Sequence, residues 1–153
     1  IDLKEAPSYH VTRCCEKLRK QSSLANSIQF FLRTRDGNHP QVTLSLTEPS
    51  DDTSLFLQAI EQGLRRVYES SQVYKKAGVM LLGLEPSKGY QTDIFNQTRQ
   101  RPELMESLDT INAKFGQDAI KFGSLGFEKR WAMRANARSP HYTSRWDDII
   151  VIS

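Results

Sequence analysis

Two apolar periodicities follow one another in the first half of the chain. From Leu3 to Lys20, apolar residues recur every three or four positions, which predicts a helix with one buried stripe. Apolar and polar residues then alternate in 27–35 and again in 42–47. This alternation predicts two half-buried strands, and the turn-forming residues at 36–40 predict that a hairpin joins them.

A second helix and a third strand complete this unit. N-cap residues at 51–52 precede a helical stripe over 53–70. A long apolar run then predicts a strand over 74–84, in a well-covered position of the sheet. The order helix, strand, strand, helix, strand predicts an α+β fold, a βαββαβ domain lacking its first strand, with two helices on one face of an antiparallel sheet.

The second half of the chain divides differently. Residues 85–100 show no sustained period and are rich in Gly, Pro, Asn and Gln, which is typical of a linker. A helix is expected from Arg101 to a cap at Gly116, a short strand at 119–122, and a strand or docked tail at 149–152. The predicted division is therefore 1–84, a linker 85–100, and a small α+β appendage 101–153.

Composition excludes several classes of protein. Hydrophobic residues make up 38% and charged residues 25% of the chain, which is typical of a soluble globular protein, and we expect neither a signal peptide nor a membrane-spanning run. The two cysteines, Cys14 and Cys15, are adjacent, so we expect no disulfide scaffold and a cytoplasmic location. The three histidines show no metal-ligand spacing, so no metal site is expected.

Two features point to partners, each with a simpler alternative. The net charge is +3, and the predicted strands place basic and hydroxyl side chains on the open face of the sheet, either to contact phosphates or as solvated surface. The residues concerned are Arg33, Arg35, Thr43, Ser45 and Lys76. In the linker, the apolar pair Ile94 and Phe95 either enters a partner's groove or folds back onto the chain's own core.

The linker motif and several other segments carry a family resemblance. The stretch Gln91, Thr92, Asp93, Ile94 and Phe95 resembles the bacterial sliding-clamp-binding pentapeptide, although Thr92 and Ile94 replace its two leucines. Other segments resemble, in the same order, the UmuC-type Y-family translesion DNA polymerases, which form the catalytic subunit of bacterial DNA polymerase V. These segments are Cys15–Arg19, Lys75–Leu81, Leu104–Asn112, Trp131–Arg134 and Ser139–Trp146.

The resemblance implies the non-catalytic C-terminal region of an error-prone polymerase of the SOS response. Its little-finger domain would bind primer–template DNA without sequence specificity, and its linker would bind the β sliding clamp. The implied DNA-contacting residues are Arg33, Thr34, Arg35, Thr43, Ser45, Lys75 and Lys76. The processed UmuD dimer and RecA are implied partners, and Mg²⁺ is implied for the parent polymerase but no cofactor for this chain. The family's first little-finger strand is absent here, and if it is internal we expect three strands with a gap.

Two other function classes compete with this interpretation. A protein-interaction module would use the same scaffold without binding DNA. A small hydrolase or nuclease would need convergent catalytic groups, and the sequence has no metal-ligand cluster, Gly-rich phosphate loop or nucleophile elbow.

Overall fold

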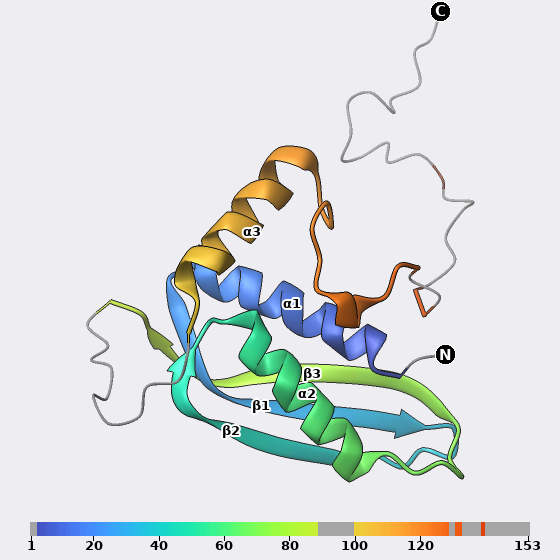
Figure 1. Cartoon of the computed structure of the whole chain (residues 1–153). Helices are drawn as coiled ribbons and strands as arrows, with labels where there is room; N and C mark the ends of the chain where they lie inside the picture. The colour runs from blue at the N-terminus through green and yellow to red at the C-terminus, as the bar shows by residue number, and fades with distance from the viewer. Residues whose placement is uncertain (1–2, 89–99, 129–130, 133–138, 140–153) are drawn as a thin grey trace, which may run out of the picture.

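The α+β class predicted from the sequence is confirmed. A computed structural model describes residues 3–88, 100–128, 131–132 and 139, and Figure 1 shows how its helices and strands are arranged. In chain order the elements are α1 (Glu5–Lys20), β1 (Ser23–Thr34), β2 (Gln41–Ser50), α2 (Thr53–Val67), β3 (Tyr74–Pro86), α3 (Pro102–Phe115) and the 3-10 helix η1 (Gly123–Leu125).

The three strands form one antiparallel sheet in the order β2-β1-β3. The central residue Ile28 of β1 pairs with Leu44 on one side and with Leu81 on the other. The prediction of three strands is therefore confirmed, but the expected internal gap is wrong, because β1 is hydrogen-bonded to both neighbours. A further strand would have to add at an outer edge of this sheet.

Strand β3 does not occupy the well-covered position that its apolar run predicted. It is an edge strand within the described sheet, and none of its residues is buried. Its apolar residues divide between the two faces, because side chains alternate along a strand. Val79 and Leu81 pack against the core, while Met80 is 51% exposed on the other face. The continuous apolar run of β3 therefore reflects a strand with apolar residues on both faces, and not a strand that other elements cover on both faces.

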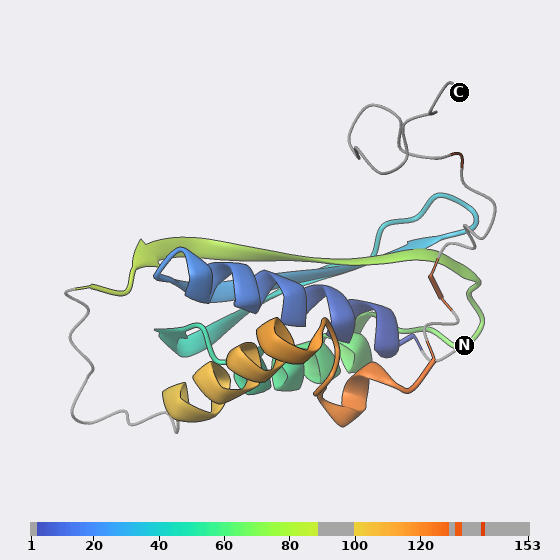
Figure 2. The same ribbon diagram turned by 90° about the horizontal axis from the view of Figure 1, so that it is seen from above.

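Helices α1 and α2 both lie on one face of the sheet, as predicted, and leave the other face open (Figure 2). Their apolar stripes meet the inward side chains of β1 in a single core. Cys15 belongs to this core, whereas Cys14 is only half-buried. The largest fully buried side chains include Phe30, Phe56, Ile28, Leu32 and Ile60.

Helix α3 packs on the side of α1 and α2 that faces away from the sheet (Figures 1 and 2). Its residue Asp109 forms an ion pair with Arg19 of α1, and its Met105 is 1% exposed. The strand predicted at 119–122 is not formed. Instead, the side chain of Asn112 exchanges two hydrogen bonds of 2.9 Å with the backbone of Ile120. The expected element at 149–152 lies outside the described residues.

Candidate nucleic-acid interface

Strand pairing determines which side chains share the helix-free face of the sheet, called the open face below. Directly paired residues point to the same side, so the exposed pair Arg33 and Lys76 identifies this face. Three further cross-strand rows follow along β1 with the same parity. They are Gln41–Phe31–Gly78, Thr43–Gln29–Met80 and Ser45–Ser27–Leu82.

The open face has a basic end, a polar side and an apolar side. Arg33 and Lys76 lie at the end of β1 next to the hairpin, and β2 adds an exposed amide and two exposed hydroxyls. No carboxylate occurs in the four rows. The sequence thus placed Arg33, Thr43, Ser45 and Lys76 correctly on this face. Such an array of cations and neutral donors suits phosphate oxygens, and contact with DNA stays a prediction.

Three of the implied contact residues lie elsewhere. Thr34 is 2% exposed, and its hydroxyl accepts a hydrogen bond of 3.0 Å from the backbone N–H of Asn38. Its inclusion in an exposed interface was wrong, because it holds the hairpin turn. Arg35 is exposed just beyond β1, where its N–H bonds to the Val73 carbonyl. Lys75 lines a cavity at the edge of β3.

This cavity is a feature that the sequence did not reveal. It has a volume of about 360 Å³ and lies between the first turns of α1 and the start of β3, with Trp131 also in its wall. Trp131 is distant in sequence from the other lining residues, so no periodicity or local motif places it there. The one signal in the sequence was the pair of adjacent lysines, Lys75 and Lys76, directly after Tyr74.

The clamp-like pentapeptide 91–95 lies outside the described residues, but the segments flanking it are described. On one side, the backbone N–H and the hydroxyl of Ser87 both donate to the Ser22 carbonyl, at 2.9 and 3.0 Å. On the other, the N–H of Arg101 donates to Asp52 at 3.0 Å, and the Gln100 amide donates to the Pro49 carbonyl at 3.3 Å. Both flanks are therefore fixed at the same end of the sheet (Figure 1).

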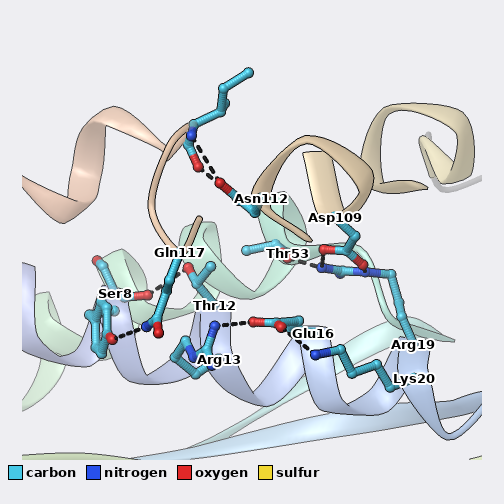
Figure 3. A network of polar contacts seen from close by, with 12 residues as sticks. Ser8, Thr12, Arg13, Glu16, Arg19, Lys20, Thr53, Asp109, Asn112 and Gln117 are labelled. Carbon is cyan, nitrogen blue, oxygen red and sulfur yellow. Dashed lines mark hydrogen bonds and ion pairs between the residues drawn. The ribbon is translucent and has the colours of Figure 1, made fainter. Parts of the chain in front are cut away.

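The ion pair between Arg19 and Asp109 fixes helix α3, which follows the linker. The guanidinium donates to both carboxylate oxygens, at 2.6 and 2.8 Å, and to the Thr53 hydroxyl (Figure 3). It also donates to the Asp51 carbonyl. Although burial alone disfavours the charged form, the hydrogen bond to Asp109 keeps the pKa of Arg19 above its usual value. The tie therefore joins α3 to α1 and to the start of α2.

Within the described part of the chain, neither a metal-binding cluster nor a membrane-crossing helix is found. No group of three or more His, Cys, Asp or Glu side chains among the described residues is placed to hold a metal ion. Among the helices of the described part, none has the length and apolar character needed to cross a membrane.

Comparison with known proteins identifies the family. Residues 1–94 match the impB/mucB/samB family C-terminal domain, and residues 102–152 match a domain of unknown function, DUF4113. Protein UmuC of Salmonella typhimurium strain LT2 is 31% identical over 97% of this chain. Proteins MucB and SamB of Salmonella typhimurium are 32% and 33% identical, over 97% and 96% of the chain.

The chain spans only 37% of the length of each of these three relatives. No solved structure matches it. The match to the C-terminal domain covers more than half of the chain and agrees with the segments that resembled the UmuC type. The chain therefore belongs to the impB/mucB/samB family of UmuC-type Y-family polymerases.

Proposed function

We propose that this chain is the DNA-gripping and clamp-tethering C-terminal region of an error-prone translesion polymerase in SOS repair. The observation that carries the DNA-binding part is the open face, with its basic end and no carboxylate in the four paired rows. Phosphate contacts position a protein on DNA without reading sequence, which suits a polymerase that accepts any template. The parent's polymerisation chemistry is not assigned to these residues.

Salt dependence of duplex binding tests the open face. Removing one cation that touches a phosphate should reduce the slope of log affinity against log salt by about 1. The variant Arg33→Ala with Lys76→Ala should therefore bind a primer–template duplex more weakly and with a slope smaller by about 2. The matched control is Arg65→Ala with Arg66→Ala, which removes two exposed cations from α2 on the helix-covered side. Equal slopes in the two variants would refute the open face as the duplex site.

The clamp-binding part rests on the pentapeptide Gln91–Phe95 and on the family of the chain. An apolar pair in a polar segment gains about 2–3 kcal/mol per side chain when a partner's groove buries it. Replacing Ile94 and Phe95 by Ala should abolish binding to the β sliding clamp in calorimetry while duplex affinity changes little. Undiminished clamp binding by this variant would rule out the motif.

One observation favours the alternative of a protein-interaction module. Phe31, Met80 and Leu82 give the open face an apolar side, and Met80 is 51% exposed there. Such surface is more typical of protein contacts than of phosphate contacts. The duplex measurement above separates the two, since an interaction module predicts no binding to primer–template DNA. The processed UmuD dimer and RecA are proposed as further partners on family grounds alone.

A further inference from the structure

The cavity beside β3 has walls that suit a flat aromatic ligand. Its volume of about 360 Å³ lies in the range of small-ligand sites. The rings of His10 and Trp131 lie 5.3 Å apart at 65°, and Tyr74 also lines the space. Phe31 reaches the cavity from the central strand because its ring occupies the position that a Cβ at Gly78 would take. Aromatic side chains from four separate segments therefore converge on one hollow.

One neutral polar group within these walls is suited to a ligand, the imidazole of His10. The indole Nε1 of Trp131 is itself buried, so this residue offers a ligand the face of its ring and not its donor. Burial lowers the pKa of His10, so its imidazole is neutral near pH 7 and offers one donor and one acceptor. A ligand carrying a ring carbonyl or a ring nitrogen can pair with this imidazole.

The rim of the cavity is cationic. Lys75 and Lys76 line it and are exposed, and the lining contains no Asp or Glu from the described residues. An apolar peptide would gain little from this charge, whereas a phosphate beside a bound ring would gain directly. Flat rings next to lysines are the combination with which proteins hold unpaired nucleotides, each stacked base contributing about 1–3 kcal/mol.

We infer that this cavity binds one unstacked nucleotide, with the base between the aromatic walls and the phosphate at Lys75 and Lys76. The ligand source that the geometry favours is single-stranded DNA, because the cavity lies at the hairpin end of the sheet, where Arg33 and Lys76 begin the open face. The site goes beyond the proposed duplex contact, since a base in a duplex is stacked and cannot enter. It shares only Lys76 with the proposed contacts of the open face.

The fluorescence of Trp131 can report the binding of a nucleotide in the cavity. The sequence has two tryptophans, so the variant Trp146→Phe leaves Trp131 as the single indole of the full chain. A base stacking near it should quench its fluorescence in a saturable way. We would titrate this variant with a short oligothymidylate, with an abasic strand of equal length and charge, and with thymidine monophosphate. The expected result is quenching by the oligothymidylate with an affinity roughly tenfold above that of the abasic strand.

Variants distinguish this site from general attraction of polyanions. Lys75→Ala with Lys76→Ala should weaken the oligothymidylate response several-fold, while Arg65→Ala with Arg66→Ala, which removes the same charge, should not. Equal responses to abasic and base-containing strands would overturn the site. The absence of a response to any nucleotide would also overturn it, and the edge of β3 would then be left for a polypeptide strand. Equal affinity for the monophosphate would support the same chemistry with a free nucleotide as its source. Duplex binding through Arg33 does not depend on any of these results.

Discussion

At the scale of single residues, the place of His10 in the fold changes its acid–base behaviour, which the sequence alone does not indicate. It lies on α1 against the cavity, beside Trp131 and near Lys75 and Lys76. Burial lowers its pKa from 6.5, because the charged imidazolium loses solvation there. His39, by contrast, is exposed in the hairpin turn.

This difference predicts a pH effect on stability. A group whose folded pKa is depressed contributes stability above its unfolded pKa of 6.5, and this contribution is lost as pH falls through the folded value. The free energy of unfolding should therefore decrease from about pH 7.5 to about pH 5.5, and His10→Gln should flatten that decrease. Urea titrations at both pH values measure it. His39→Gln is the control, and a flattening of the same size in that variant would contradict the assignment to His10.

At the scale of elements, the tie between α1 and α3 has a measurable role. Arg19 and Asp109 have side chains only 11% and 26% exposed, so their bidentate contact is largely shielded from water. Asp109→Asn removes the charge and one acceptor while Arg19 keeps its bonds to Asp51 and Thr53. We expect a loss of about 1–3 kcal/mol in unfolding free energy, with faster hydrogen exchange in α3.

A neighbouring substitution controls for the general effect of losing a carboxylate on α3. Glu106 is exposed on the same helix, one turn before Asp109. Glu106→Gln should leave both stability and the exchange rate of α3 nearly unchanged, as surface substitutions usually do. Similar losses in the two variants would mean that the tie to Arg19 does not hold the helix.

The elements themselves were largely predictable, but their neighbours were not. Periodicity of Ile28, Phe30 and Leu32 identified β1 and its inward face, because alternation is a property of one strand. It carries no information on which strand pairs with which, so β3 was assigned a covered position that it does not have. Thr34 continues the inward alternation of Ile28, Phe30 and Leu32, so its burial follows from the strand pattern, and only the family resemblance had placed it among the DNA contacts.

At the scale of the whole molecule, the described flanks of the linker and the basic end of the open face lie at opposite ends of the sheet. Ser22, which holds the flank at Ser87, directly precedes β1, whereas Arg33 lies at the strand's far end. Strand β1 has 12 residues, which at about 3.3 Å per residue separates these ends by about 35 Å. The cavity beside Trp131 lies at the same end as Arg33, near the start of α1.

This separation predicts that a clamp and a duplex bind without affecting each other. A distance of about 35 Å exceeds several screening lengths at physiological salt, so charge repulsion between the two partners' sites is weak. Duplex affinity measured with saturating clamp should therefore equal that measured without it, within about twofold, and the same ratio must hold in the reverse titration. The double variant Ile94→Ala with Phe95→Ala is the control, because it gives the duplex affinity when clamp is present in solution but does not bind the chain. Competition between clamp and duplex would show that one surface serves both, and would overturn the assignment of the open face and the linker to separate partners.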